Sequence, residues 1–361
     1  MADVTASTTI PEYHRAAWIE NPGPNGTIRI RADVPTPRPG EGEVLVKMEC
    51  CGICGSDIRP LLGYGAYTPV PGHEGVGTVV QLGPGAPPSL LGARVGVKWL
   101  WSACGTCSLC RAGRANNCAK QLNTGRSVQG TLAEYARAHA QYLTRIPDGV
   151  DSAVAAPLLC AGLSLMGALS KIEHREPRGS SVVILGAGGG LGHLGVQIAR
   201  EKGYTVIAVD AGAAKAALSR ECGAAEYIDL AETEDDDDAV EARVRQLTDG
   251  EGAHAVVVVP GTESAFELAP RLVRNGGTIV AVGLPRNDFL LPLGPTALSA
   301  RGLTVVGASV GTEAEMEELL RLAAQGKVVP RVQVCAFEDT PQVLEKLKRA
   351  DVVGRYVVRI P

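Results

Sequence analysis

Residues 184–192 read Ile-Leu-Gly-Ala-Gly-Gly-Gly-Leu-Gly, a glycine-rich turn between an aliphatic run and an amphipathic stretch. Gly186, Gly189 and Gly192 form a G-x-x-G-x-x-G pattern, a variant of the dinucleotide-binding fingerprint G-x-G-x-x-G. Such glycines let the backbone turn tightly and approach a pyrophosphate, whose negative charge meets the N-terminus of the following helix. Because many strand-to-helix turns contain glycine, the turn alone is weak evidence, and its surroundings decide its meaning.

Apolar strand-like runs and amphipathic helical stretches alternate around this turn from about residue 180 onward. Near-continuous Val/Ile runs separated by crossover helices predict a parallel sheet with helices on both faces. The expected strands are Ser181–Leu185, Thr205–Asp210, Ala225–Leu230, Ala255–Val259, Gly277–Val282 and Leu303–Ser309, and the expected helices include His193–Lys202, Ala214–Glu221, Asp238–Leu247 and Glu263–Arg274. Six such strands predict an α/β fold with a doubly wound parallel (Rossmann) sheet.

The second expected strand ends in Asp210, 18 residues after Gly192. An acidic residue there is suited to the ribose 2′-hydroxyl of a dinucleotide and repels a 2′-phosphate, which favours NAD(H) over NADP(H). The cofactor-binding residues predicted from this pattern are Gly186, Gly189, Gly190, Leu191, Gly192 and Asp210.

The N-terminal part of the chain has another texture. Residues from about 25 to 150 are rich in glycine and proline between short apolar runs, which predicts an irregular, mainly β domain with many turns. After the alternating region come an expected helix at Glu313–Ala324, another near Pro341–Arg349 and a terminal strand at Tyr356–Ile360. We therefore expect one domain from residues 1–160 and 310–361, and a nucleotide-binding domain from residues 161–309.

Composition limits the possible functions. The chain has 361 residues, 45% apolar and 20% charged, with a formal charge of −4, which describes a globular protein and argues against non-specific nucleic-acid binding. The uncharged stretch Ala153–Ser170 contains Pro157 and two glycines and is short for a membrane span, so we expect a buried helix. Met1–Thr9 lacks the apolar region of a secretory signal, so the ten cysteines indicate reduced thiols and a cytoplasmic location.

Four of these cysteines are regularly spaced. Cys104, Cys107, Cys110 and Cys118 follow the pattern C-x2-C-x2-C-x7-C, and four thiolates this close can close a tetrahedral zinc site that leaves no open position. Such a zinc would be structural. Packing cysteines or a disulfide pair are a less favoured interpretation, and an iron–sulfur cluster is a further alternative because its ligands use similar short spacings.

A second set of residues is dispersed along the chain and gains meaning only from a resemblance. The segments Cys51-Gly-Ile-Cys54-Gly-Ser56-Asp57, Gly72-His73-Glu74-Gly75, Val97-Lys98-Trp99-Leu100, Leu159-Cys160-Ala161-Gly162 and Val353-Gly354-Arg355-Tyr356-Val357-Val358 resemble the zinc-dependent medium-chain alcohol dehydrogenases. The resemblance runs nearly end to end from Val44 and is closest to the yeast-type ethanol dehydrogenase branch. The other cysteines, Cys50, Cys51, Cys222 and Cys335, are interpreted as small buried apolar residues.

The resemblance implies a GroES-like catalytic domain, NAD(H) and two zinc ions per chain. Cys54, His73 and Cys160 would hold a catalytic zinc with one open position, and Cys104, Cys107, Cys110 and Cys118 a structural zinc. Asp57 would hydrogen-bond His73, Glu74 would lie beneath the metal, and Ser56 would pass the alcohol proton. Lys215, Ser164 and Arg355 would contact the cofactor, and Leu61, Leu62, Trp99 and Trp101 would line the substrate pocket. Relatives of this kind form homo-oligomers, with a tetramer favoured over a dimer.

The implied reaction is reversible hydride transfer between an alcohol carbon and the nicotinamide ring, with an alcohol or aldehyde as substrate. Two positions depart from the family pattern. Arg59 stands where a relay histidine is common and cannot act as a base near neutral pH, so we expect a steeper pH dependence, and Gly55 removes a basic contact to the cofactor phosphates. Leu61 replaces a tryptophan of some ethanol-specific relatives, which suggests a larger alcohol. The alternatives are a larger specialised-metabolite alcohol or aldehyde, or a non-catalytic zinc-stabilised NAD-binding protein.

Overall fold

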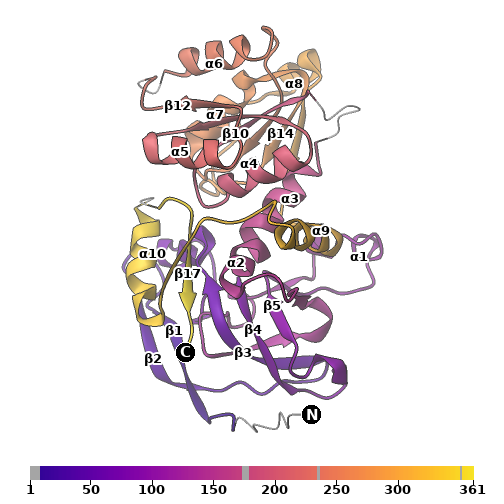
Figure 1. Ribbon diagram of the computed structural model, residues 1–361, viewed down its shortest axis with the longest axis vertical. Coiled ribbons are helices and arrows are strands. Elements are labelled where there is room, and N and C mark those ends of the chain that lie inside the picture. The colour runs from indigo at the N-terminus through magenta and orange to yellow at the C-terminus, as the bar shows by residue number, and fades with distance from the viewer. Residues whose placement is uncertain (1–8, 173–178, 234–235, 350–351) are drawn as a thin grey trace. The chain divides into compact units, whose positions relative to one another are not determined.

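The computed structural model describes residues 9–172, 179–233, 236–349 and 352–361, so most of the N-terminal stretch considered above lies outside the described residues. The chain divides into two units (Figure 1). The first unit comprises Met1–Cys160, Val332–Asp351 and Tyr356–Pro361, and the second comprises Ala161–Arg331 and Val352–Arg355.

The second unit is built on a six-stranded parallel sheet among the described residues. Its strands are β10 (Ser181–Leu185), β11 (Thr205–Asp210), β12 (Glu226–Asp229), β13 (Ala253–Val258), β14 (Val273–Ala281) and β15 (Thr304–Gly307), in the order β12-β11-β10-β13-β14-β15. Its helices are α3 (Leu163–Leu169), α4 (Gly192–Glu201), α5 (Ala213–Glu221), α6 (Asp237–Gln246), α7 (Glu263–Leu272), α8 (Pro295–Arg301) and α9 (Glu313–Ala324). The strand order reverses between β10 and β13, which is the topological switch point of a doubly wound sheet. The predicted fold class is confirmed.

Alternation along the strands explains why this sheet is covered on both faces. Val183 and Leu185 of β10 belong to one apolar cluster that includes Val240 of α6 and Phe266 of α7. Ile184 lies between them in sequence and faces α4, where a β-carbon on Gly195 would lie 3.5 Å from its Cδ1 atom. Because successive residues of a strand point to opposite faces, a strand buried on both sides is apolar throughout.

The first unit is mainly β. Its seven-stranded sheet has the order β16-β17-β3-β4-β5-β9, with β8 also paired to β3. These strands are β16 (Val332–Ala336), β17 (Arg355–Arg359), β3 (Glu43–Gly52), β4 (Gly75–Leu82), β5 (Arg94–Val97), β9 (Thr144–Arg145) and β8 (Tyr135–His139). Two further two-stranded sheets pair β1 (Tyr13–Glu20) with β2 (Thr27–Pro35) and β6 (Leu100–Ser102) with β7 (Leu122–Asn123). The helical segments are α1 (Ser108–Arg111), α2 (Ser152–Pro157) and α10 (Thr340–Lys348), with short 3-10 turns η1 (Gly55–Leu62), η2 (Pro88–Leu90), η3 (Ala115–Asn117), η4 (Ala140–Tyr142) and η6 (Phe337–Asp339).

The uncharged helical stretch Ser152–Leu169 has the length and apolar composition of a membrane span, with a mean hydropathy of 1.8, but 83% of it is buried inside the folded molecule. Core helices satisfy the same criteria. The structure departs from a single regular helix, because α2 ends at Pro157 and a π-helical turn, η5 (Leu158–Gly162), precedes α3. Such turns are rare and are frequent at functional sites, and this one contains Cys160.

The division of the chain differs from the expected boundaries at two places. Residues 310–331 and Val352–Arg355 group with the nucleotide-binding half, not with the mainly β unit. The reason is packing: α9 contacts α3, and a β-carbon on Gly167 would lie only 2.3 Å from the carbonyl oxygen of Val310. Contacts between residues this far apart in sequence have no local signal.

Candidate metal centre and nucleotide turn

Cys54, His73, Glu74 and Cys160 gather in the first unit. All four are buried, and their ligand atoms lie within 4.8 Å of one another. The Cys54 and Cys160 sulfurs are 3.9 Å apart, and Nε2 of His73 is 3.3 Å from the Cys160 sulfur. The structure therefore brings together three side chains separated by up to 106 residues, as the resemblance implied.

Asp57 ties two of these segments together. Its carboxylate accepts hydrogen bonds from the backbone amides of Cys54 (2.9 Å) and Gly72 (3.1 Å) and contacts Nδ1 of His73 at 3.1 Å. Burial alone would lower the pKa of His73, but the Asp57 charge and hydrogen bond raise it well above its usual value. Because Asp57 engages Nδ1, Nε2 is left facing the two sulfurs.

The turn before His73 requires glycine. Gly72 has a φ of 97°, a left-handed conformation that side chains rarely adopt. A β-carbon there would also lie 2.7 Å from the backbone nitrogen of Leu132. The chain can therefore turn sharply into β4 and aim His73 at Cys160 only with glycine at this position.

The donor set and its spacing fit one zinc ion. Tetrahedral zinc with Zn–S bonds of about 2.3 Å places two sulfur ligands about 3.8 Å apart, close to the 3.9 Å between Cys54 and Cys160. A disulfide requires sulfurs at about 2.05 Å, so these thiols are not oxidised to one another. Two thiols and one imidazole are also three protein ligands, the number that leaves a fourth position open for substrate oxygen.

The second cluster is formed by Cys104, Cys107, Cys110 and Cys118, whose sulfurs also lie within 4.8 Å of one another. The sulfur pairs 104–110 and 107–118 are 3.9 Å apart, and the pair 118–104 is 3.6 Å apart. These spacings fit one tetrahedral ion. In an iron–sulfur cluster the four thiolates are shared between two or more iron atoms, so some sulfur pairs must stand farther apart than they do here, and the geometry disfavours that alternative.

The thiols of the four-cysteine cluster differ in electrostatic environment, and burial raises the pKa of Cys110 to about 12. Backbone hydrogen bonds from Thr106 and Cys107 lower the pKa of Cys104 to about 6, which favours the thiolate that a metal needs. Burial raises the pKa of Cys222 and of Cys335 to about 11 and that of Cys50 to about 12. Cys51 is fully buried beside Thr131, with its pKa raised well above normal. These last four thiols suit apolar packing.

The other predicted residues around the buried cluster lie at different places. Ser56 Oγ is 3.3 Å from Nε2 of His73, and the Trp99 ring meets the His73 ring edge-on at 5.2 Å. Leu61 is 1% exposed in the apolar core, whereas Leu62 is 39% exposed. The described contacts of Trp101 place its ring against His139, not at the cluster. Arg59, at the position of the relay histidine, lies over the ring of Tyr64.

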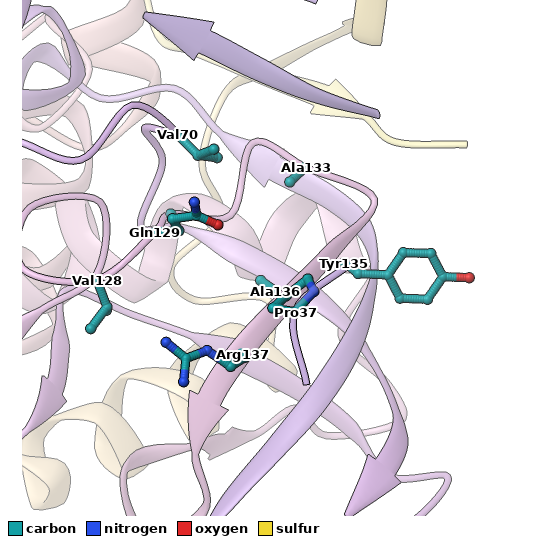
Figure 2. Close-up of a pocket in the computed structure, with 9 residues that line it drawn as sticks. Pro37, Val70, Val128, Gln129, Ala133, Tyr135, Ala136 and Arg137 are labelled. Atoms are coloured by element: carbon teal, nitrogen blue, oxygen red, sulfur yellow. The ribbon is translucent and has the colours of Figure 1, made fainter. Parts of the chain in front are cut away.

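Figure 2 shows a separate hollow in the first unit, where the Tyr135 ring points away from the other labelled side chains. It is lined by Pro37, Val70, Val128, Gln129, Gly130, Ala133, Tyr135, Ala136 and Arg137. The residues of the two cysteine clusters do not line this hollow. Arg137, its charged residue, is paired with Glu43 at 3.0 Å, so the hollow offers no unengaged charge to a substrate.

The glycine-rich turn lies in the second unit between β10 and α4, at the switch point of the sheet. A β-carbon on Gly192 would lie 2.0 Å from the carbonyl oxygen of Gly186, so glycine is required for this close approach. The amide of Gly188 donates to Asp210 at 2.9 Å. The turn and the acidic end of β11, predicted to bind one dinucleotide, are therefore in direct contact.

Asp210 is buried and its carboxylate has further partners. It accepts from the amide of Ala211 at 2.8 Å and pairs with Lys215 Nζ at 2.8 Å. Lys215 thus lies beside the predicted ribose site. Arg355 is 3% exposed, and a β-carbon on Gly190 would lie 3.1 Å from its Cδ atom. Ser164 is 7% exposed in α3, four residues after Cys160.

Sequence reasoning missed two features of these sites. For Asp57 it indicated only the contact with His73, although the carboxylate also holds the backbone on both sides of the cluster. It also passed over His193, which directly follows the last glycine of the turn and is fully buried. The available signal was a histidine in the otherwise apolar first turn of a helix.

Comparison with known proteins identifies the family to which the chain belongs. Residues 40–148 match the model of the alcohol dehydrogenase GroES-like domain, and residues 190–325 match the model of zinc-binding dehydrogenases. The chain is 41% identical over 332 residues to an alcohol dehydrogenase of Geobacillus stearothermophilus, covering 91% of this chain and 94% of the relative. It is 38% identical over 368 residues to alcohol dehydrogenase 2 of Emericella nidulans, covering 98% and 99%.

Among solved structures, the chain is similar to acetophenone reductase from Geotrichum candidum in complex with NAD. The TM-score is 0.83 at 29% identity, and the match covers 98% of each chain.

Proposed function

The chain belongs to the zinc-binding medium-chain alcohol dehydrogenase family and is an NAD-dependent zinc alcohol dehydrogenase, and on this premise we propose how its residues divide the work. The main observation behind this proposal is that Cys54, His73 and Cys160 are buried close together, so that two thiols and one imidazole have a spacing that fits a zinc ion. The first unit is the catalytic domain, and the second is the NAD-binding domain.

Cys54, His73 and Cys160 hold the catalytic zinc, and Cys104, Cys107, Cys110 and Cys118 hold a second, structural zinc, so that each chain carries two. The catalytic zinc supplies Lewis-acid polarisation of the substrate oxygen. Glu74 is a buried carboxylate beside the ligands, and Asp57 fixes the ring of His73 by holding Nδ1.

In oxidation, bound NAD⁺ would accept the hydride that leaves the alcohol carbon, and the hydroxyl would give up a proton. Ser56 takes part in moving that proton, because its hydroxyl both donates and accepts hydrogen bonds and lies beside His73. Arg59 is positioned over Tyr64 and cannot accept the proton, so the proton passes from Ser56 to water.

The second unit binds NAD(H). Gly186, Gly189, Gly190, Leu191 and Gly192 approach the pyrophosphate, Asp210 and Lys215 bind the adenosine ribose, and Arg355 neutralises the phosphates. Ser164 faces the nicotinamide. Three carboxylate contacts of Asp210 are used within the protein, and a carboxylate offers about four acceptor sites, which leaves one for the ribose.

The finer family assignment is to the yeast-type branch, supported by the segments around Trp99, Cys160 and Arg355. For the substrate we propose an alcohol or aldehyde larger than ethanol, bound beside Trp99; of the other predicted pocket residues, Leu61 lies in the apolar core and Trp101 packs against His139. Trp99 has the most direct support, because its ring touches His73. The similarity to an acetophenone reductase is compatible with a larger substrate.

We also propose that the chain forms a homo-oligomer, with a tetramer favoured over a dimer. Strand β15 is an edge strand of the sheet, Val305 on it is 39% exposed, and Leu290 nearby in sequence is 85% exposed. An exposed edge with apolar neighbours favours pairing with a second copy. None of the ten cysteines, all of which lie in the described residues, forms a disulfide, which supports a cytoplasmic location.

The test of this function is a panel of ethanol, hexanol and benzyl alcohol assayed by NADH absorbance, with NAD⁺ and NADP⁺, before and after zinc chelation. We expect NAD⁺-dependent oxidation that is strongest with the larger alcohols, is lost on chelation and returns when zinc is added back. The measured zinc content should be two per chain. Unchanged turnover after removal of both ions, or NAD⁺ binding without turnover of any alcohol, would contradict the proposal.

Asp57→Asn provides a finer prediction. Asparagine keeps the size of the side chain but removes the charge that holds Nδ1 of His73, and it offers a single oxygen to the amides of Cys54 and Gly72. We expect about a 10- to 100-fold loss in zinc affinity or kcat/KM. Measurement of activity against free zinc concentration separates these effects. Asp33→Asn, on an exposed strand in the same unit, is the control and should leave both unchanged.

A further inference from the structure

His193 occupies an unusual position in the second unit. It lies in the first turn of α4, immediately after the glycine-rich turn, and is fully buried. Its Nδ1 atom is 2.9 Å from the carbonyl oxygen of Gly189, and its Nε2 atom is 3.0 Å from the backbone amide of Arg331. A carbonyl needs a donor and an amide needs an acceptor, so both bonds exist only when the ring is neutral and carries its hydrogen on Nδ1.

These two hydrogen bonds are part of a chain of contacts that begins and ends at the glycine-rich turn. The carbonyl oxygen of Arg331 accepts from the amide of Arg355 at 2.8 Å. A β-carbon on Gly190 would lie 3.0 Å from the carbonyl oxygen of Gly354 and 3.1 Å from Cδ of Arg355. The path therefore runs from the glycine turn through His193 and Arg331 to Arg355, and returns to the same turn.

Gln197, one helical turn farther along α4, holds the neighbouring part of the same segment. Its Nε2 atom donates to the carbonyl of Val329 at 3.0 Å, and its Oε1 atom accepts from the amide of Val329 at 2.8 Å. These bonds anchor the segment but do not reach the glycine turn. The Nε2 atom also donates to the backbone carbonyl of His193 at 3.1 Å, so Gln197 tests the anchoring of this segment and of the His193 backbone, apart from the bonds of the His193 ring.

We propose that His193 is a positioning residue of the dinucleotide site, and that its neutral ring couples the glycine turn to Arg355 through the backbone of Arg331. This inference rests on the proposed NAD-binding role of the turn and of Arg355. It adds that the two parts of the phosphate site are set by one side chain, which touches neither cofactor nor substrate.

The charges around the ring agree with this role. Burial, together with the positive charges of Arg355 and Arg331, lowers the pKa of His193 to about 4, whereas the hydrogen bond to Gly189 raises it. Since the folded state resists protonation and the unfolded chain does not, stability from this group is complete above about pH 6.5 and falls as the pH drops toward 4. The ring is thus neutral throughout the range in which the enzyme would bind NAD⁺.

The test is a double-mutant cycle on NAD⁺ affinity at pH 7.5, measured by calorimetry. We expect His193→Ala and Arg355→Met each to weaken NAD⁺ binding about tenfold, and the double variant also by about tenfold and not a hundredfold, because both break one coupled unit. His193→Gln, whose oxygen can reach the Arg331 amide, should restore most of the affinity, whereas His193→Asn should not. Gln197→Leu should weaken binding less than His193→Ala.

A second measurement follows the ring itself. Imidazole ¹⁵N chemical shifts at pH 7.5 should report a hydrogen on Nδ1 and an unprotonated Nε2. Additive effects in the cycle, unchanged affinity of His193→Ala, or a hydrogen on Nε2 would overturn the inference. Failure of the unmodified enzyme to bind NAD⁺ would instead overturn the proposed function.

Discussion

Replacing His73 with alanine is expected to reduce kcat/KM for alcohol oxidation at least about a thousandfold, which corresponds to roughly 4 kcal/mol of lost transition-state stabilisation. The variant removes the one nitrogen of the buried cluster and leaves the two sulfurs of Cys54 and Cys160, 3.9 Å apart. Two protein ligands do not hold a zinc ion firmly in the required geometry. Metal analysis should therefore show zinc falling from two ions per chain to one.

The control for this variant is Cys335→Ala. Cys335 is a half-buried thiol of the same unit, outside both clusters, and its loss should leave zinc content and activity within a factor of two. NAD⁺ affinity should be unchanged in both variants, because the glycine turn lies in the other unit. A His73→Ala enzyme that keeps two zinc ions and near-normal turnover would show that the cluster is not the catalytic centre.

Local periodicity was sufficient for much of the second unit. The expected bounds of Ser181–Leu185 and Thr205–Asp210 agree with β10 and β11 residue for residue, and Glu313–Ala324 agrees with α9. Each of these elements has an unbroken apolar or amphipathic run with clear ends. Their local pattern and their packing therefore favour the same structure.

Features that depend on contacts between distant residues could not be predicted in this way. The sequence around Cys160 predicts only a buried helix, and no residue pattern marks the π-helical turn within it. The grouping of α9 with α3 depends on the backbone approach of Val310 to Gly167. The convergence of Cys54, His73 and Cys160 came from family resemblance, because nothing in their spacing brings them together.

The thiol cluster was readable from spacing alone, since its four members lie within 15 residues. Its neighbours explain why those cysteines matter for stability. Between residues 101 and 120 only Asn116 and Cys118 are buried, and the one α-helix there, α1, has four residues. Such a lobe has almost no apolar core, so the metal must act as its cross-link, as in small zinc domains.

We therefore expect Cys107→Ala to lose one zinc ion and to destabilise the lobe by several kcal/mol. The thermal midpoint should fall by about 10 °C, since 1 kcal/mol corresponds to roughly 2–4 °C for a unit of this size. Limited proteolysis should cut the variant between residues 104 and 118, where Cys104 and Cys118 are 3.6 Å apart in the folded chain. Cys222→Ala removes a buried thiol outside the clusters and should leave the lobe resistant to protease. If Cys107→Ala keeps both zinc ions and the same protease resistance, the four sulfurs do not bind a structural ion, and the lobe must be held by contacts that its exposed surface does not indicate.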